Sequence, residues 1–230
     1  MDLGKQVLEA GLPDGNRILF RPFAEGDSEM VRDVYIHGHY DLLDLQPGEV
    51  VFDVGAHIGS FALKAARLVG EEGTVVAIEP EYSNYEILRE NAGRLGNIIP
   101  LPLALSDFQG RGRLFIAPGT IAHSISFAKS SAWQEVEVET IDGLIERTGL
   151  RPDAVKIDAE GAALDILSAA KDISIRRVAV AAYHYPMEDA EVRSKLRGMG
   201  LLTDVRLVRA SIYRSPFTPY VPIVLGMKSP

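Results

Sequence analysis

Short apolar runs alternate with stretches of helical periodicity along most of the chain. Runs rich in β-branched residues are typical of strands buried on both faces. We expect such strands at residues 50–54, 74–78, 97–105, 153–158, 177–182, 202–208 and 221–227. Apolar positions three and four residues apart predict helices at 60–69, 83–95, 162–170 and 188–199, and Thr140 is the expected N-cap of a further short helix.

This order of elements predicts the fold class. Repeated strand–helix units build a doubly wound α/β fold around a parallel sheet. Because no helix separates the runs 202–208 and 221–227, the last strand is expected to be antiparallel. We therefore predict a seven-stranded, mostly parallel, Rossmann-like sheet. Pro100 and Pro102 predict that the third strand is irregular or lies at an edge.

Two segments depart from the alternation. Residues 1–49 contain one predicted strand, 17–21, and one predicted helix, 28–38, and we interpret them as a small cap over one end of the sheet. Residues 50–230 then form the main domain. A Ser-, Ala- and Gly-rich loop at 118–132 has a length that is typical of a functional or mobile segment.

Charge is distributed unevenly along the chain, with a basic segment near its C-terminus. The chain has 24 Lys and Arg against 32 Asp and Glu, a net charge of −8, which argues against a general nucleic-acid binder. Residues 193–230 nevertheless carry a net charge of +6, which leaves −14 for the rest. Basic residues on an edge strand commonly protect it from pairing with other chains. The segment 193–214 is also the place where an anionic partner would dock.

The absence of cysteine excludes disulfides, thiolate metal sites and a cysteine nucleophile. No apolar run approaches the roughly 18–20 residues of a membrane-spanning helix, so we expect no membrane partner. The N-terminus has no secretory pattern, and a cytoplasmic location is the expectation.

The strongest chemical signal is the sequence Asp53-Val-Gly55-Ala-His-Ile-Gly59, followed by Glu79 at the end of the second predicted strand. Ligands of open α/β sheets bind beyond the carboxyl ends of the strands. Gly55 permits a tight turn, and Gly59 lets the helix begin close to the sheet with its N–H groups directed at the loop. The Glu79 carboxylate can accept hydrogen bonds from both hydroxyls of an adenosine ribose.

Two features favour S-adenosyl-L-methionine over a dinucleotide. The spacing is D-x-G-x-x-x-G and not the G-x-G-x-x-G of pyrophosphate binders. The negative charge of Asp53 is unfavourable beside a pyrophosphate and suits a ligand with an ammonium and a sulfonium. A nucleotide-binding oxidoreductase and a non-catalytic binding module remain alternatives.

The chain also resembles a known family. The blocks that carry the resemblance are Asp53–Gly59, Val76–Pro80, Glu90-Asn91, Ala104–Asp107, Thr140–Asp142 and Lys156-Ile-Asp-Ala-Glu-Gly161, which recur in this order in FkbM-type methyltransferases. The resemblance implies a class I S-adenosylmethionine-dependent methyltransferase, most often an O-methyltransferase acting on natural products or sugars. The candidate cofactor-binding residues are Asp53, Gly55, Ala56, His57, Gly59, Ser60, Glu79, Pro80, Ala104 and Ser106.

The sequence departs from the family pattern at three places. His57 stands where Asn is usual, Ala163 stands where a second Glu is common, and Ala182-Tyr183-His184 stands where Glu-x-His is frequent. These changes leave the glycines and Glu79 intact, so they bear on the acceptor more than on the cofactor.

Methyl transfer to a neutral hydroxyl needs a base to take its proton. The candidates at the ends of the fourth and fifth predicted strands are Asp158, Glu160 and His184. We predict no metal, because His37 and His39 have no placed carboxylate beside them. A small-molecule acceptor is the first prediction, and an RNA or protein acceptor docking at 193–214 is the alternative.

Overall fold

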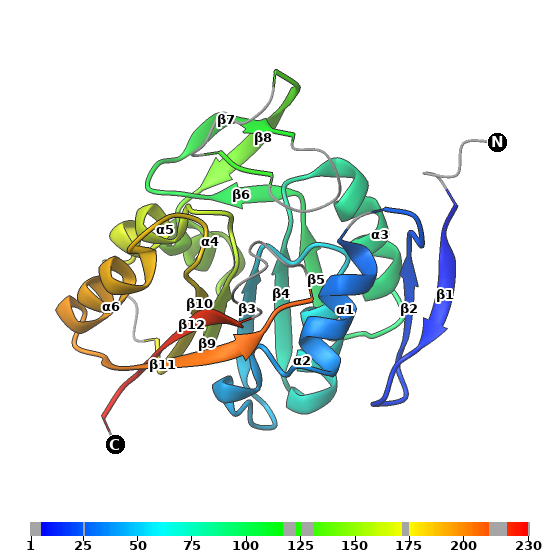
Figure 1. The fold of residues 1–230 in the computed structure, drawn as a ribbon, viewed down its shortest axis with the longest axis horizontal. Helices are drawn as coiled ribbons and strands as arrows, with labels where there is room; N and C mark the ends of the chain where they lie inside the picture. The colour runs from blue at the N-terminus through cyan, green and yellow to red at the C-terminus, as the bar shows by residue number, and fades with distance from the viewer. Residues whose placement is uncertain are drawn as a thin grey trace.

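A seven-stranded sheet with the order β11-β12-β10-β9-β3-β4-β5 forms the centre of the computed structural model (Figure 1). The structure describes residues 6–24, 26–116, 123–125, 131–171, 175–211 and 220–229. The strands of the sheet are β3 (Val50–Val54), β4 (Thr74–Ile78), β5 (Ile98–Leu101), β9 (Ala154–Ile157), β10 (Arg177–Ala181), β11 (Leu202–Arg209) and β12 (Tyr220–Met227). The pairs from β5 to β10 are parallel, and β12 runs antiparallel to both β10 and β11, which confirms the predicted fold class.

Helices cover both faces of the sheet (Figure 1). They are α1 (Asp27–Tyr35), α2 (Ser60–Val69), α3 (Tyr82–Ala92), α4 (Ile141–Thr148), α5 (Ala163–Ala169) and α6 (Glu188–Gly198). Successive strand residues face opposite cores: Val51 packs on the side of α1 to α3, and Phe52 packs on the side of α4 to α6. Because both faces are buried, the strands show no polar alternation. Among the described residues, no helix has the length and apolar character that crossing a bilayer requires.

The third predicted strand, 97–105, is broken into two. β5 ends at Leu101, and β6 (Leu103–Leu105) pairs with β8 (Trp133–Glu139), which pairs in turn with β7 (Gly110–Phe115). Pro102 separates the two strands and has no backbone N–H to donate to a ladder. The prolines thus mark the point where the chain leaves the large sheet for a second, three-stranded sheet above it (Figure 1).

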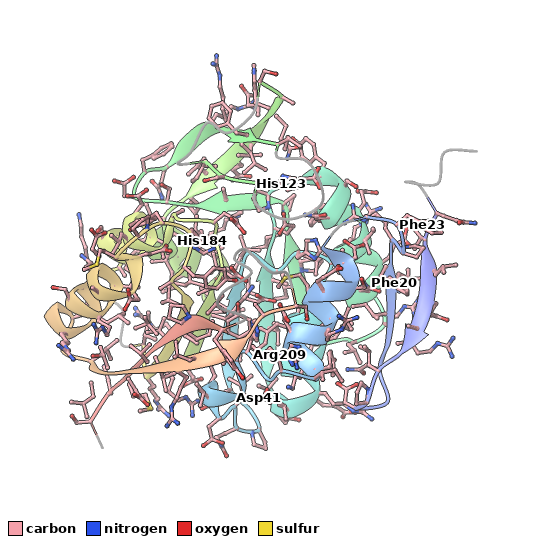
Figure 2. All side chains as sticks on the ribbon, viewed as in Figure 1. Phe20, Phe23, Asp41, His123, His184 and Arg209 are labelled. Atoms are coloured by element: carbon pink, nitrogen blue, oxygen red, sulfur yellow. The ribbon has the colours of Figure 1, made fainter. Side chains whose placement is uncertain are left out.

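The N-terminal residues contribute a hairpin, β1 (Leu8–Gly11) and β2 (Arg17–Phe20), followed by α1 and a short 3-10 helix, Asp41–Leu43. The hairpin strand β1 was not predicted, because its residues are mostly exposed and show no apolar pattern. The cap shares the core of the sheet, since Val34 packs in the same cluster as helix α2. The cap also contacts β11, an edge strand of the seven-stranded sheet. His39 Nε2 lies 2.6 Å from the carbonyl oxygen of Arg209, which is labelled in Figure 2.

Two helix starts test the predicted caps. Thr140 Oγ1 accepts the N–H of Gly143 at 3.0 Å, as predicted. The next helix upstream begins differently: Glu81, and not Ser83, is its N-cap and accepts the N–H of Asn84 at 2.7 Å. Ser83, where the sequence predicts this helix to begin, lies instead in its first turn and accepts a hydrogen bond from Arg21 of the N-terminal segment. Most of the predicted loop 118–132 lies outside the described residues.

Candidate active site

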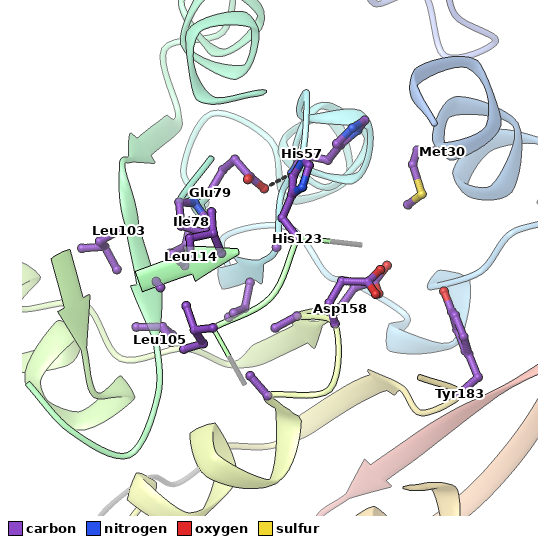
Figure 3. Close-up of a pocket in the computed structure, with 18 of the residues that line it drawn as sticks. Met30, His57, Ile78, Glu79, Leu103, Leu105, Leu114, His123, Asp158 and Tyr183 are labelled. Carbon is purple, nitrogen blue, oxygen red and sulfur yellow. Dashed lines mark hydrogen bonds between the residues drawn. The ribbon is translucent and has the colours of Figure 1, made fainter. Parts of the chain in front are cut away.

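A pocket lies beyond the carboxyl ends of β3, β4 and β9, where the sequence places the ligand (Figure 3). It encloses about 970 Å³ of empty space, part of which is open to solvent. Of the predicted residues, Gly55, His57, Glu79, Pro80, Ala104, Asp158 and Glu160 line it. Met30 and Asp33 of α1 form part of its wall, so the N-terminal cap contributes to the site.

The loop after β3 requires glycine because of a neighbouring loop. Gly55 has a φ of 74°, and a Cβ atom there would lie 2.0 Å from the backbone oxygen of Asp158. Gly59 has a φ of 92° and lies close to Leu88 of α3. Gly55 thus permits the predicted tight turn, and the close contact that excludes a Cβ atom is made by the loop after β9.

Asp53 is buried beneath this loop and does not line the pocket. Its Oδ1 lies 2.9 Å from Lys156 Nζ, and both side chains are at most 2% exposed. The ammonium group also donates to the carbonyl oxygen of Gly55 at 2.5 Å. Burial raises the pKa of the Asp53 carboxyl, and Lys156 partly offsets that effect. The structure therefore places the Asp53 charge against Lys156, where it holds the loop in position.

Glu79 joins the loop after β3, residues 55–59, to the start of α3; we call these residues the cofactor loop. Its Oε2 accepts the backbone N–H of His57 at 2.8 Å, and its Oε1 accepts the N–H of Glu81 at 3.0 Å. Each carboxylate oxygen retains a lone pair for a further donor. Burial raises the pKa of Glu79 to about 7, although these two N–H donors act in the opposite direction.

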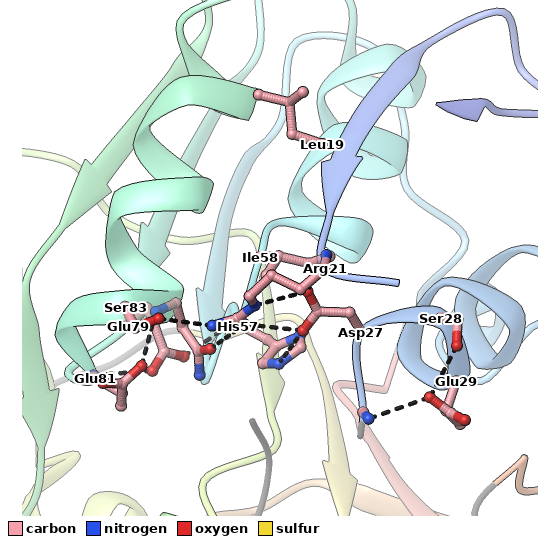
Figure 4. A network of polar contacts seen from close by, with 12 residues as sticks. Leu19, Arg21, Asp27, Ser28, Glu29, His57, Ile58, Glu79, Glu81 and Ser83 are labelled. Atoms are coloured by element: carbon pink, nitrogen blue, oxygen red, sulfur yellow. Dashed lines mark hydrogen bonds and ion pairs between the residues drawn. The ribbon is translucent and has the colours of Figure 1, made fainter. Parts of the chain in front are cut away.

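A buried polar network ties the cap to this loop (Figure 4). Arg21 donates to both carboxylate oxygens of Asp27, at 2.9 and 2.8 Å, and also to Ser83 Oγ at 2.7 Å. Asp27 Oδ1 lies 3.4 Å from Nε2 of His57. Burial lowers the pKa of His57 to about 4 despite the nearby Asp27 carboxylate, so this imidazole is neutral at pH 7.

The remaining predicted cofactor residues do not line the pocket. Ala56, Gly59 and Ser60 are absent from the pocket wall, and the N–H of Ala56 donates to the carbonyl oxygen of Ile78 at 2.9 Å. Ser106 is buried, and its N–H donates to the carbonyl oxygen of Glu139 at 3.0 Å.

The three candidate bases lie together beyond β9 and β10. His184 Nε2 is 3.6 Å from Asp158 Oδ1 and 3.8 Å from Glu160 Oε1. Asp158 also accepts the hydroxyl of Tyr40 at 2.8 Å. Asp158 and Glu160 line the pocket, whereas the His184 side chain is 1% exposed and lies behind them.

The charges of this cluster are coupled. Burial would lower the pKa of the His184 imidazole, but the carboxylates of Asp158 and Glu188 outweigh burial and raise it to about 9. Burial would likewise raise the pKa of Asp158, but His184 and Lys156 hold it well below its usual range. An ionised carboxylate therefore faces the pocket, with a positive charge behind it.

Residues 53–201 match the family described as "Methyltransferase FkbM domain". The chain belongs to the FkbM methyltransferase family. This result confirms the resemblance, identifies the protein as an enzyme of the methyltransferase class, and identifies S-adenosyl-L-methionine as its methyl donor.

Other comparisons with this FkbM methyltransferase are consistent with that result. It is 32% identical over 100 residues to the "Probable cobalt-precorrin-6B C(15)-methyltransferase (decarboxylating)" of Saccharolobus solfataricus, a match covering 40% of this chain and 49% of that protein. It is 46% identical over 56 residues to a 23S rRNA (uracil(1939)-C(5))-methyltransferase of Psychrobacter arcticus, covering 24% of this chain and 11% of that protein. The chain thus spans less than half of either relative.

The fold is shared with a solved structure. Aeropyrum pernix fibrillarin in complex with natively bound S-adenosyl-L-methionine superimposes on the FkbM methyltransferase with a TM-score of 0.55 and 13% identity. The match covers 99% of this chain and 96% of that one. It supports the class I methyltransferase fold over the whole length.

Sequence reasoning missed two residues that contact the candidate bases Asp158 and His184. Tyr40 donates to Asp158 from a segment that carries no motif. Glu188 Oε2 lies 3.0 Å from His184 Nδ1. The second contact had a usable signal, because a carboxylate four residues after a histidine, at the start of a predicted helix, can reach back to it.

Proposed function

We propose that this methyltransferase transfers the methyl group of S-adenosyl-L-methionine to a hydroxyl oxygen of a small acceptor. The observation that carries the proposal is the position of the Asp158 carboxylate. It lies in the same pocket as Glu79, at the end of the strand next to the cofactor loop (Figure 3). With the ribose at Glu79, the sulfonium methyl group would be directed toward Asp158.

The boundaries of the pocket favour a small acceptor. Met30 and Asp33 of the cap bound it on one side, and His123 and Ile125 bound it on another. Ala210, which follows β11, also lines it. An acceptor held among these segments would have the size of a small molecule or of a side chain inserted from a larger partner.

The reaction is an in-line displacement. The acceptor oxygen forms a bond to the methyl carbon while the bond between that carbon and sulfur breaks. The electron pair of the broken bond stays on sulfur, so the sulfonium becomes a neutral thioether. The reacting atoms need to be held about 3–3.5 Å apart and in line. The acceptor O–H is oriented by hydrogen bonding to Asp158, which receives the proton as the oxygen becomes acidic during transfer. His184 is then a positioning residue behind this carboxylate.

An RNA acceptor receives less support from the basic segment 193–214. Within its described part, Arg197 Nε donates to Thr203 Oγ1 at 2.8 Å, and Arg206 Nε donates to Asp204 Oδ2 at 2.9 Å. Arg214 lies outside the described residues. Local pairing of this kind reduces the positive charge that phosphate binding needs.

The proposal is tested with Asp158→Asn and with Asp204→Asn as a control for loss of a carboxylate. Release of S-adenosylhomocysteine is measured with panels of hydroxylated small molecules and with RNA. We expect turnover of a small hydroxylated acceptor, lowered about 10²–10⁴-fold by Asp158→Asn, with cofactor affinity nearly unchanged. Methylation of RNA alone, or unaltered turnover in the Asp158 variant, would contradict the proposal.

A further inference from the structure

One nitrogen of His184 has a partner and the other does not. Nδ1 lies 3.0 Å from Glu188 Oε2, and the same oxygen accepts the backbone N–H of His184 at 2.6 Å. Nε2 has no hydrogen-bond partner among the described residues, although the side chain is only 1% exposed. Buried polar groups are nearly always partnered. The orientation of Nε2 therefore points to a bound ligand.

Two carboxylates face this nitrogen at distances that do not suit hydrogen bonds. The separations of 3.6 Å to Asp158 and 3.8 Å to Glu160 exceed the hydrogen-bond range. One ligand atom from each of the three residues lies within 4.8 Å of the other two. Around an octahedral cation with bonds of about 2.1 Å, neighbouring ligands are about 3 Å apart and opposite ones about 4.2 Å. The observed spacing suits a cation between the three groups once the three ligand atoms move slightly closer together.

We propose that Asp158, Glu160 and His184 bind a first-row divalent cation such as Mn²⁺. Two carboxylate oxygens and one imidazole nitrogen are a mixed ligand set: the nitrogen favours a first-row transition-metal ion, and among these the two carboxylates suit Mn²⁺. Glu188 supports the site because a carboxylate on Nδ1 fixes the imidazole with Nε2 directed toward the cation, which takes the place of the Nε2 proton. Its side chain is fully buried, which holds the imidazole in one orientation.

The cation would face the acceptor. Asp158 and Glu160 line the pocket and His184 lies behind them, so the remaining coordination positions open toward the pocket. A hydroxyl bound there has a lowered pKa. With the cation bound, Asp158 would be a ligand and not the base, and the acceptor hydroxyl would lose its proton to water before its oxygen attacks the methyl carbon. This role rests on the proposed function, whereas binding of the cation does not.

The test uses the full chain, freed of metal with a chelator and titrated with Mn²⁺ alone. Calorimetry measures the stoichiometry, and electron paramagnetic resonance measures free Mn²⁺. We expect one Mn²⁺ per chain. His184→Gln and Glu160→Gln are expected to weaken binding by more than about tenfold, and Glu188→Gln by about 10–100-fold. Asp204→Asn, which removes an exposed carboxylate on β11, is expected to bind as the wild type does.

The outcomes separate the two proposals. No saturable binding at millimolar Mn²⁺, or equal binding by all four variants, overturns the cation site. If His184→Gln does not fold, Glu160→Gln and Glu188→Gln decide the question, because both leave the imidazole in place. Mn²⁺ binding without methylation of any hydroxyl would contradict the proposed function alone. Full methyl transfer by metal-free enzyme that binds no Mn²⁺ would contradict the cation site alone.

Discussion

At the scale of single residues, the site depends on buried charges with assigned partners. Lys156 neutralises Asp53, Arg21 neutralises Asp27, and these pairs contact the loop after β3 at Gly55 and at His57, respectively. Removing one member of a buried pair leaves an uncompensated charge and costs more than the pair itself contributes. The residues around the cofactor are therefore sensitive to changes in side chains that never touch it.

Replacing Lys156 with Met is expected to lower the free energy of unfolding by about 3–5 kcal/mol, because Asp53 then remains charged and unpaired in the core. Chemical denaturation measures this change. The double variant with Asp53→Asn should recover part of the loss, since it removes the unpaired charge. A double variant no more stable than Lys156→Met would show that the pair is not the cause.

The raised pKa of Glu79 predicts that cofactor affinity depends on pH. The ribose hydroxyls need the ionised carboxylate, and burial raises its pKa to about 7. The group is ionised at pH 8 and mostly protonated at pH 6. The dissociation constant of S-adenosylhomocysteine should therefore increase about tenfold from pH 8 to pH 6, as calorimetry would show. His57 stays neutral throughout this range, because its pKa is about 4.

Glu79→Gln tests that assignment. We expect affinity at pH 8 to fall by at least about tenfold through loss of charge-assisted hydrogen bonds, and the dependence on pH to disappear. A variant that kept the pH dependence of the wild type would assign the titration to another group.

At the scale of elements, the loops after β3 and β9 fit together through one glycine. Gly55→Ala would place a Cβ atom against the backbone oxygen of Asp158. Gly149→Ala is the control, because Gly149 has a left-handed conformation with a φ of 70° and no described heavy atom within 4 Å of its Cβ position. The control should lose about 1–2 kcal/mol of stability from backbone strain alone.

Gly55→Ala should lose about 1–3 kcal/mol more than this control, as overpacked sites do, and should also lose affinity for S-adenosylhomocysteine. Thermal denaturation and calorimetry measure the two effects. Equal stability losses at Gly55 and Gly149 would show that the loop after β9 can move away from the added Cβ atom at no cost in stability.

Elements with a strong local pattern could be predicted from the sequence. Strands such as 50–54 are buried on both faces and read as continuous apolar runs, and the glycine loop and Glu79 follow them at fixed spacings. The split of 97–105 could be anticipated only as irregularity, since which sheet the second half joins depends on β8, far along the chain. The shared pairing of Asp53 and Lys156 likewise depends on the register of two parallel strands, which no local pattern encodes.

The acceptor side of the site was predicted less completely. Asp158, Glu160 and His184 could be identified as candidates from their positions at strand ends. Their mutual distances, and the contacts of Tyr40 and Glu188, depend on how the loops and the cap close over the sheet.

At the scale of the whole molecule, the N-terminal cap is continuous with the rest of the protein. Arg21 lies at the centre of the attachment, because it contacts Asp27 of α1 and also Ser83 and Asn84 of α3. Its side chain is 8% exposed. Movement of the cap away from the pocket would have to break this buried cluster.

Arg21→Met is expected to loosen the cap. Amide hydrogen exchange in α1 should become faster, and stability should fall by about 3–5 kcal/mol because Asp27 is left unpaired. Arg17→Met serves as the control: Arg17 is 63% exposed and pairs with Glu9 at the surface, where such pairs contribute about 0–1 kcal/mol. Unchanged exchange in α1 of the Arg21 variant would show that the cap is held by its apolar contacts instead.

The contact between Gly55 and the carbonyl group of Asp158 has a consequence for the engineering of this enzyme. The loop proposed to hold the donor and the backbone of the carboxylate proposed to face the acceptor touch each other, so neither can be shifted without moving its neighbour. A change of acceptor preference therefore has to come from the other walls of the pocket. Met30 and Asp33 of the cap, with Ala210 after β11, are the positions to diversify in a library that keeps the donor site intact.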